Sequence, residues 1–461
     1  MNQPENLNKG GNKNTDEGKR VAFNDIAQGV LQTVPDLKTL SSGFLNLARM
    51  SPLGRITIGK VVEFWARETP FQIAIKFEGK QWTYAEFNAW ANRVAASFRA
   101  QGIGTGDVVG ILLENSPEVL VCVAAIAKLG GIAAMLNHNQ RGEVLAHSFT
   151  LVSPKLIVTS GACHEQFAST SFTPKQKPAI TFMWVESDEI QLPEGFIDLK
   201  HDCRGRCEKN PASTGKVKSK QPCYYIFTSG TTGLPKASIM THYRWSAVLT
   251  GIGILSLRIR PDDVFYCCLP LYHNNALTVS WGTVLSAGAT MAIDRKFSAS
   301  RFWNRIHYYN ATAFCYIGEL LRYLLNQSPS ENDKQHRVRM IVGNGLRPEI
   351  WADFEERFGI SRISEFYGAS EANIGFINWF GISQTAGFTP LPYAIVKFDN
   401  DTDEPVRNAK GFMERVDAGE TGLLISEVSK TRPFDGYTDK AASERKLMRN
   451  VFKKGDCWFN S

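Results

Sequence analysis

The stretch that decides the fold runs from Tyr225 to Ala237 and reads YIFTSGTTGLPKA. An apolar strand leads directly into a loop of hydroxyl-bearing residues and glycines that ends at Lys236. Glycine has no Cβ, so its backbone N–H group can approach phosphate oxygens, while the hydroxyls add donors and the lysine adds positive charge. The pattern therefore predicts a loop that binds an oligophosphate.

Strand-like and helix-like runs alternate on both sides of this loop, which favours an α/β fold with mostly parallel sheets covered by helices. Beyond about residue 390, short alternating runs separated by turn residues predict a small β-rich part instead. We predict strands over 107–113, 132–136, 155–158, 223–228, 264–269 and 339–342, and helices over 84–101, 118–128, 300–308 and 319–326.

The same patterns divide the chain into parts. Residues 1–20 are rich in Asn, Lys and Gly and are predicted to be a disordered tail, and 21–57 form a helical lead-in whose role stays open. The main body, 58–461, is predicted to hold two α/β subdomains, about 58–225 and 226–390, and a β-rich subdomain, about 391–461.

The composition excludes several classes of protein. Hydrophobic residues make up 43% and charged residues 21% of the 461-residue chain, as in ordinary folded proteins. The net charge of +7 is modest and not clustered, so we expect no nucleic-acid partner. Nine scattered cysteines indicate reduced thiols and a cytoplasmic location. The apolar run 119–136 is interrupted by Lys128 and by two glycines, which favours a buried helix, turn and strand over a membrane span.

The run from Thr228 to Lys236, TSGTTGLPK, resembles the phosphate loop of the adenylate-forming superfamily, which includes acyl-CoA synthetases and luciferases. Further similar runs follow in the order of that family, over residues 58–461. They are WTYAEFNAWANRVA (82–95), LPLYHNNAL (269–277), VGNGLRPEIW (342–351), EFYGASEAN (365–373) and GETGLL (419–424). The wording of GNGLRPEIW, YGASEAN and FDGY is most similar to the fatty-acid transport protein and very-long-chain acyl-CoA synthetase branch.

The resemblance implies the large domain of the adenylate-forming fold and a two-step reaction. A fatty acid would react with ATP to give acyl-AMP and pyrophosphate, and coenzyme A would then displace AMP. The implied cofactors are ATP, Mg²⁺ and coenzyme A, and the chemistry would rest mainly on positioning and electrostatic stabilisation of phosphoryl oxygens.

The resemblance also implies three nucleotide-binding segments. The first, for the phosphates, is Thr228, Ser229, Gly230, Thr231, Thr232, Gly233, Leu234, Pro235 and Lys236. The second, against the base, is Gly343, Asn344, Gly345 and Leu346. The third is Glu365, Phe366, Tyr367, Gly368, Ala369, Ser370 and Glu371, in which Tyr367 would stack on adenine and Ser370 replaces a common threonine.

The resemblance assigns Mg²⁺ to Glu371 and Thr231. It assigns catalytic roles to Lys236, Glu371 and Thr231, and to His273, which lies outside these segments, at the mouth of the acyl pocket. Apolar residues within 277–285 and 315–320 are candidates for the acyl tunnel, with Trp281 the first choice for substitution, although core packing explains them equally well. The basic residues Lys216, Lys218 and Lys220 could contact CoA phosphate or anionic lipid, or be simply solvated.

The chain ends at Ser461, where the family would continue into a ribose-binding aspartate, a hinge and a small C-terminal domain. From this comparison we expect the 461 residues alone to bind substrates weakly and to turn over poorly.

The sequence is compatible with two other functions and disfavours a third. The protein could be a ligase for another carboxylic acid, such as a bile acid, an aryl acid or carnitine, or a non-catalytic fatty-acid binding or uptake protein. A P-loop NTPase is disfavoured, because the Gly-Lys-Ser/Thr ending of its phosphate loop is absent. Peripheral contact with the inner face of a membrane, the acyl chain length and the oligomeric state stay open.

Overall fold

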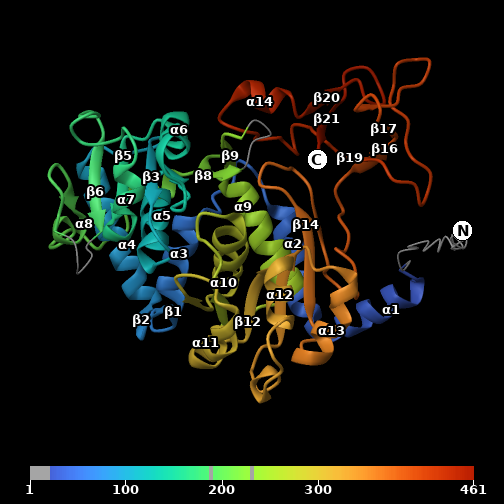
Figure 1. Ribbon diagram of the computed structural model, residues 1–461, viewed down its shortest axis with the longest axis horizontal. Coiled ribbons are helices and arrows are strands. Elements are labelled where there is room, and N and C mark those ends of the chain that lie inside the picture. Colours follow the sequence, from blue (N-terminus) through green and yellow to red (C-terminus); the bar gives the residue numbers. More distant parts are fainter. Residues whose placement is uncertain (1–20, 186–190, 229–232) are drawn as a thin grey trace, which may run out of the picture.

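Two large sheets, both mostly parallel, form the body of the protein, and a smaller antiparallel sheet lies beside them (Figure 1). The computed structural model describes residues 21–185, 191–228 and 233–461. The predicted α/β class is confirmed. The predicted tail, 1–20, lies outside the described residues.

The first sheet has seven strands in the order β7-β6-β5-β3-β4-β8-β9. All neighbouring strands are parallel except β8 and β9, which form an antiparallel hairpin. The strands are β3 (Val108–Leu112), β4 (Ile132–Met135), β5 (Leu156–Ser160), β6 (Thr181–Val185), β7 (Ile197–Asp198), β8 (Pro222–Thr228) and β9 (Lys236–Thr241).

The second sheet has eight strands in the order β15-β14-β13-β12-β10-β11-β1-β2, with antiparallel pairs only at its two ends. The strands are β1 (Ile73–Phe77), β2 (Lys80–Thr83), β10 (Val264–Cys267), β11 (Thr290–Ile293), β12 (Ala313–Ile317), β13 (Met340–Asn344), β14 (Ile363–Gly368) and β15 (Gly375–Ile377).

The third sheet is antiparallel, in the order β16-β19-β21-β20, and a two-stranded ribbon, β17-β18, accompanies it. Its strands confirm the short β elements predicted beyond residue 390. They are β16 (Tyr393–Val396), β17 (Phe398–Asp399), β18 (Glu404–Pro405), β19 (Leu423–Glu427), β20 (Leu447–Arg449) and β21 (Cys457–Asn460).

Capping residues mark the ends of the two long helices α4 and α5. For α4, the side chain of Thr83 accepts from the Glu86 N–H while Glu86 reaches back to the Thr83 N–H. For α5, a proline opens the helix and Gly130, at φ 75°, closes it. The helices are α1 (Phe23–Gln32), α2 (Leu37–Arg49), α3 (Ile58–Glu68), α4 (Tyr84–Ala100), α5 (Pro117–Leu129), α6 (Gly142–Val152), α7 (His164–Ala168), α8 (Leu199–Asp202), α9 (His242–Val248), α10 (Trp281–Ala287), α11 (Phe302–Tyr309), α12 (Gly318–Leu325), α13 (Pro348–Phe358) and α14 (Lys440–Glu444).

The apolar run 119–136 forms the buried helix α5 and the buried strand β4, as predicted. Lys128 is fully buried, and its Nζ donates to Glu63 Oε1 at 3.0 Å, to Asn88 Oδ1 at 2.8 Å and to Asn210 Oδ1 at 3.0 Å. Three acceptors satisfy the three N–H donors of a buried ammonium. Within the described ranges, the structure contains no helix that is both long and apolar enough to cross a membrane.

The two sheets do not divide the chain at residue 225, where the sequence suggested a boundary between subdomains. Strands β1 and β2 join the second sheet, because β1 pairs in parallel with β11. Strands β8 and β9 complete the first sheet, because β8 pairs with β4. Pairing partners far apart in sequence leave no local signal, so periodicity located these strands without assigning them to a sheet.

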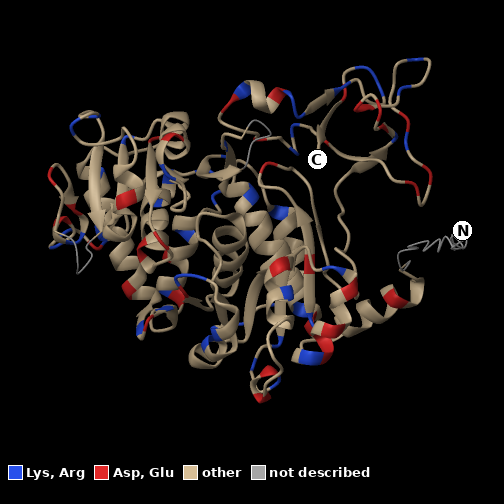
Figure 2. Ribbon diagram, viewed as in Figure 1, with Lys and Arg blue, Asp and Glu red and all other residues tan. Residues whose placement is uncertain are grey.

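One hydrophobic core links both large sheets. It contains Val62 of α3, Phe87 of α4, Val109 of β3 and Phe314 of β12 among its buried members. All nine cysteines are free, in agreement with the prediction of reduced thiols. Figure 2 shows Lys and Arg interspersed with Asp and Glu over the ribbon.

Candidate active site

The β8–β9 hairpin carries the predicted phosphate loop. Thr228, the last residue of β8, pairs with Lys236, the first residue of β9, so the predicted loop connects the two strands of the hairpin. Gly233 has φ 84°, a left-handed conformation that suits glycine. Four of the predicted residues, Ser229, Gly230, Thr231 and Thr232, lie outside the described residues.

The β9 strand is tied to the segment that contains the predicted metal ligand. The hydroxyl of Ser238, on β9, donates to the backbone oxygen of Ser370 at 2.9 Å. Arg244 of α9 donates to the same oxygen at 2.8 Å and to the backbone oxygen of Ala372 at 2.7 Å. Since Glu371 lies between these two carbonyls, the structure fixes its backbone relative to Lys236.

Tyr437 contacts both predicted charged residues. Its hydroxyl donates to Glu371 Oε1 at 2.8 Å, and the Nζ of Lys236 lies 5.8 Å from the centre of its ring. Burial and the Glu371 carboxylate raise the pKa of Tyr437, so the phenol keeps its proton. The backbone of 436–438 runs along β9, because the N–H of Ile239 donates to Gly436 and that of Thr438 to Ala237.

The buried side chain of Glu365 binds the backbone of the loop that follows β13. One carboxylate oxygen accepts from the backbone N–H groups of Gly345 and Leu346, the second from the Tyr316 hydroxyl. At Gly343, a Cβ would lie 2.3 Å from the Tyr316 carbonyl oxygen, so only glycine fits there. Burial raises the pKa of Glu365, and these three hydrogen bonds oppose that effect. The carboxylate of Glu365 is buried beneath this loop, and the prediction that Glu365 contributes to cofactor binding stays a prediction.

The YHNN run joins the two predicted adenine segments. Asn274 donates to the hydroxyl of Ser370 at 2.9 Å, and Asn275 donates to Asn344 Oδ1 at 2.7 Å. These asparagines lie at the start of a π-helical segment, Asn275–Ser280, that leads into α10. These hydrogen bonds connect the segments that follow β10, β13 and β14. The three strands belong to the eight-stranded sheet, and their carboxyl ends lie at the same edge of it.

Tyr367 and His273 both have accessible rings. Tyr367, on β14, is 43% exposed, and its hydroxyl is 2.8 Å from the Ser461 hydroxyl. An exposed ring face could stack on a flat base. The surrounding protein desolvates His273, and together with neighbouring His138 this lowers its pKa, so the imidazole is neutral near pH 7. Its ring lies 4.5 Å from that of Tyr272.

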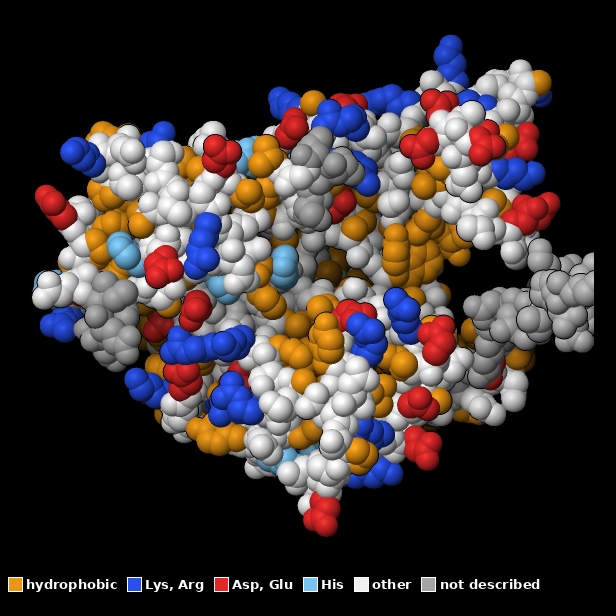
Figure 3. All heavy atoms as spheres, viewed as in Figure 1, with side chains coloured by type: hydrophobic (Ala, Val, Ile, Leu, Met, Phe, Trp, Pro, Cys, Tyr) orange, Lys and Arg blue, Asp and Glu red, His pale blue; other side chains and the backbone are white. Residues whose placement is uncertain are grey.

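A cavity of about 500 Å³ opens at the carboxyl ends of β4, β10 and β12. Three residues of the predicted acyl stretch 315–320 line it, namely Ile317, Glu319 and Leu320. By contrast, Trp281 of the other predicted stretch, 277–285, is buried in the core, with its ring centre 6.3 Å from that of Phe87. Figure 3 shows this side of the molecule hollowed near its centre, with hydrophobic side chains around the hollow.

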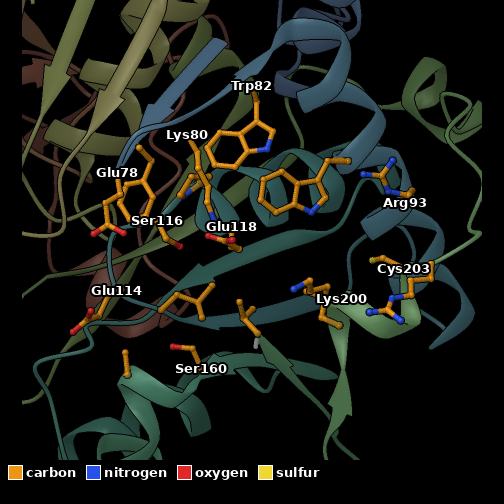
Figure 4. Close-up of a pocket in the computed structure, with 18 of the residues that line it drawn as sticks. Glu78, Lys80, Trp82, Arg93, Glu114, Ser116, Glu118, Ser160, Lys200 and Cys203 are labelled. Atoms are coloured by element: carbon orange, nitrogen blue, oxygen red, sulfur yellow. The ribbon is translucent and has the colours of Figure 1, made fainter. Parts of the chain in front are cut away.

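A larger groove of about 1160 Å³ lies between the β1–β2 hairpin and the ends of β3, β5 and β6 (Figure 4). Trp82 and Trp90 lie side by side there, with ring centres 5.7 Å apart. Arg295 contacts Glu78 at 2.6 Å and Glu114 at 3.7 Å, and it lines both this groove and the 500 Å³ cavity. None of the predicted site residues lines the groove.

The contributions of Tyr437, Arg244 and the two asparagines were not assigned from the sequence. Tyr437 closes the run FDGY, which resembles the family but indicates no role for the tyrosine, and Arg244 follows the phosphate hairpin. The two contacts that define Tyr437 span 66 and about 200 positions of the chain. A single sequence carries no signal for contacts of that separation.

Residues 62–423 match the model of a family described as "AMP-binding enzyme". The chain belongs to the AMP-binding enzyme family. Among curated relatives, it is 46% identical to the medium/long-chain-fatty-acid–CoA ligase FadD6 of Mycobacterium tuberculosis, over 96% of this chain and 72% of that protein. It is 38% identical to human long-chain fatty acid transport protein 1, over 89% of this chain and 65% of that protein. The chain therefore spans about two thirds of the length of these relatives.

Solved structures agree on the fold of this AMP-binding enzyme. The anthranilate CoA ligase AuaEII in complex with anthranoyl-AMP aligns with a TM-score of 0.72 at 18% identity, covering 89% of this chain and 75% of that one. ATP-bound MatB from Rhodopseudomonas palustris aligns with a TM-score of 0.69 at 20% identity, covering 88% of this chain and 75% of that one. The predicted adenylate-forming fold is confirmed.

Proposed function

We propose that the protein is an ATP-dependent fatty acid–CoA ligase. The observation that carries the proposal is the hydrogen-bonded frame in which Tyr437 contacts Lys236 and Glu371 while Ser238 and Arg244 hold the backbone beside Glu371. The names of the relatives, a fatty-acid–CoA ligase and a fatty acid transport protein, support the choice of acid.

In the first step, an oxygen of the fatty carboxylate attacks the α-phosphorus of ATP. The bond from that phosphorus to the oxygen of the β-phosphate breaks, and pyrophosphate leaves with both electrons of the bond. Lys236 supplies positive charge to the phosphates, and the backbone at Gly233 leaves room for their approach. Tyr367 and the 343–346 loop hold the base, so that the frame fixes the α-phosphorus relative to the acid.

In the second step, the thiol of coenzyme A loses its proton and attacks the acyl carbonyl, and AMP leaves. The acyl chain would occupy the 500 Å³ cavity that Ile317 and Leu320 line. His138 lines this cavity, and His273 lies close enough to His138 for the two to interact electrostatically. A neutral imidazole there would hydrogen-bond a carboxylate or carbonyl oxygen.

The residues present fit a Mg²⁺ ion. Glu371 is half-buried and uses Oε1 for Tyr437, and among the described residues no group donates to its Oε2. Mg²⁺ is usually bound by one or two carboxylates together with substrate phosphates and water. Within the same ranges the structure contains no cluster of three or more His, Cys, Asp or Glu that could hold a metal ion. The predicted ligand Thr231 and phosphate oxygens of the substrate would join Glu371 in the ligand set. When bound, the ion would neutralise charge on the phosphates.

The test is pyrophosphate release with ATP, Mg²⁺ and a long-chain fatty acid, beside binding of a fluorescent ATP analogue as a readout independent of turnover. We expect release to require the fatty acid, and Lys236→Ala and Glu371→Gln each to lower it by about 100-fold. Lys334→Ala, at an exposed lysine outside the predicted site, is the matched lysine control. Fatty-acid binding without pyrophosphate release by the full-length protein would identify a non-catalytic binding protein.

A panel of carboxylic acids in the same assay decides the substrate class. Preference for a long alkyl chain would support the proposal, and preference for an aryl acid, a bile acid or carnitine would replace it. We also propose a cytoplasmic protein that touches a membrane peripherally. The exposed apolar side chains of Phe23, Leu31 and Leu37 on the N-terminal helices support this contact.

A further inference from the structure

Four arginines gather at one edge of the eight-stranded sheet, opposite the edge that carries the candidate active site. Arg362 directly precedes β14 and Arg339 directly precedes β13, so both lie at the amino ends of parallel strands. Strand β14 has six residues and spans about 20 Å, which separates Arg362 from the predicted adenine segment at its other end. We call these residues the arginine cluster; its members are Arg258, Arg260, Arg339 and Arg362.

The members of the arginine cluster lie close to one another. Arg339 Nη2 contacts the backbone oxygen of Arg258 at 3.5 Å, and Arg362 Nη2 donates to the backbone oxygen of Ser256 at 2.7 Å. Burial, and then the positive charges of Arg258 and Arg339, lower the pKa of Arg362 to about 9. Arg260 is exposed, and the side chain of Arg339 is 28% exposed. The cluster is therefore a concentration of positive charge that solvent reaches.

One of the two carboxylates at the cluster, Asp263, is fully engaged. Its two oxygens accept two hydrogen bonds from the guanidinium of Arg339. They also accept from the Thr312 hydroxyl at 2.7 Å and from the backbone N–H of Arg260 at 2.7 Å. A carboxylate has about four positions for hydrogen-bond donors, and these contacts fill them. Asp263 therefore neutralises Arg339 and does not serve the side chains of the other three arginines.

The second carboxylate, Asp36, is only a loose partner of Arg258. It belongs to the short helix Val34–Asp36 between α1 and α2, and its Oδ2 lies 3.5 Å from Arg258 Nη1, whereas charged hydrogen bonds measure about 2.7–2.9 Å. Arg258 is 7% exposed, and among the described residues its Nε has no hydrogen-bond partner. Within residues 21–185, 191–228 and 233–461, no carboxylate forms an ion pair with Arg362 or Arg260. Buried cations in proteins are usually paired, and these guanidiniums carry more positive charge than the carboxylates beside them neutralise.

We propose that the arginine cluster binds a phosphate group, either as a free phosphate ion or as a phosphate monoester. Four guanidiniums less two carboxylates leave two positive charges, which a phosphate dianion neutralises. The planar fork of a guanidinium also matches phosphate oxygens, and Arg362 uses only Nη2, for Ser256, so its other N–H groups can donate to the anion. The phosphate displaces Asp36 from Arg258. The proposal concerns the edge of the sheet remote from the candidate active site, and it stands whichever acid that site activates.

The first test is thermal unfolding of the 461-residue chain in millimolar inorganic phosphate and in chloride of the same ionic strength. An anion that binds only the folded chain raises Tm. We expect phosphate to raise Tm in the wild type and equally in Lys236→Ala, which removes the lysine of the candidate nucleotide site. Arg362→Gln should lose this shift. The matched control, Arg55→Gln, at an exposed arginine outside the cluster, should keep it. Where Arg362→Gln does not fold, Arg260→Gln, at the exposed member of the cluster, takes its place and should reduce the shift.

The second test uses Asp36→Asn, for which the expected change has the opposite sign. Because Asp36 competes with the anion for Arg258, loss of its charge should tighten phosphate binding about 5-fold, the factor that corresponds to a part-exposed ion pair. Calorimetric titration with inorganic phosphate measures this affinity, which a merely structural role of Asp36 would leave unchanged.

Three results overturn the proposal. They are the absence of a phosphate shift in the wild type, an equal shift in the wild type and Arg362→Gln, and an unchanged or weaker affinity in Asp36→Asn. Loss of the shift in Lys236→Ala would also overturn it, because the phosphate would then bind at the nucleotide loop. Pyrophosphate release, measured alongside, separates these outcomes from a failure of the ligase assignment.

Discussion

The hydroxyl of Tyr437 donates a hydrogen bond to Glu371 Oε1 at 2.8 Å, while the ring of the same tyrosine lies 5.8 Å from the Nζ of Lys236. One side chain thus contacts a candidate metal carboxylate and a candidate phosphate-binding lysine. Its backbone is fixed on the edge of β9 through Gly436 and Thr438. Tyr437 is therefore placed to position both charged groups before nucleotide binds.

Tyr437→Phe should lower kcat/KM about 10-fold, because a hydrogen bond to a charged group contributes about 1.5–3 kcal/mol. The half-saturating Mg²⁺ concentration should rise, since Glu371 loses a partner that orients it. Tyr437→Leu should lower kcat/KM further, because Lys236 also loses its contact with the aromatic ring. Steady-state kinetics over a Mg²⁺ series measures both. Tyr308→Phe, at an exposed tyrosine, is the control, and an unchanged Mg²⁺ dependence in Tyr437→Phe would refute the positioning role.

Glu365→Ala should lower the free energy of unfolding by about 3 kcal/mol. It leaves the buried N–H groups of Gly345 and Leu346 and the Tyr316 hydroxyl without their acceptor. Urea unfolding measures the change. Glu319→Ala removes an exposed carboxylate paired with Arg322 and should cost less than about 1 kcal/mol. Equal losses in the two variants would mean that Glu365 does not brace the loop.

Arg244→Lys should destabilise the protein by about 2–4 kcal/mol and weaken nucleotide binding. Arg244 donates to the backbone oxygens of Ile239, Ser370 and Ala372, and a lysine ammonium cannot reproduce this planar fork. Thermal unfolding and titration with a fluorescent ATP analogue give the two quantities. Arg260→Lys, at an exposed arginine, should change neither. Full nucleotide affinity in Arg244→Lys would show that the carbonyl contacts do not shape the site.

His242 should make the fold sensitive to acid. Burial lowers the pKa of His242 to about 3 from 6.5, so between these values the unfolded chain binds a proton that the folded chain does not. Stability from this group is present above pH 6.5 and is lost as pH falls towards 3, by about 3 kcal/mol between pH 7 and 4. His242→Gln should flatten the dependence of the unfolding free energy on pH over this interval. His307→Gln, at an exposed histidine, should leave it as in the wild type, and an identical slope in all three proteins would contradict the assignment.

Much of the fold was predictable from local pattern. The bounds of strand β3 and helix α5 were predicted to within a residue or two. An unbroken apolar run marks the strand, and Pro117 and Gly130 stand at the two ends of the helix, so both signals are local. The sequence did not predict which strands belong to which sheet, since β1 pairs with β11 more than 200 positions away. Periodicity states which face of a strand is buried but not which strand lies beside it.

The candidate site likewise has features that the sequence predicted and features that only the tertiary structure decided. The run from Thr228 to Lys236 by itself predicted a loop that binds an oligophosphate, because hydroxyls, glycines and a lysine follow an apolar strand there. The metal-binding role of Glu371 in the run YGASE rested on the resemblance to the adenylate-forming family. Only the tertiary structure decided that Glu365 braces a loop and that Tyr437 joins Lys236 to Glu371. Those roles depend on hydrogen bonds that form after distant segments pack together, and the free energy that selects them belongs to the packed state and to no single stretch of sequence.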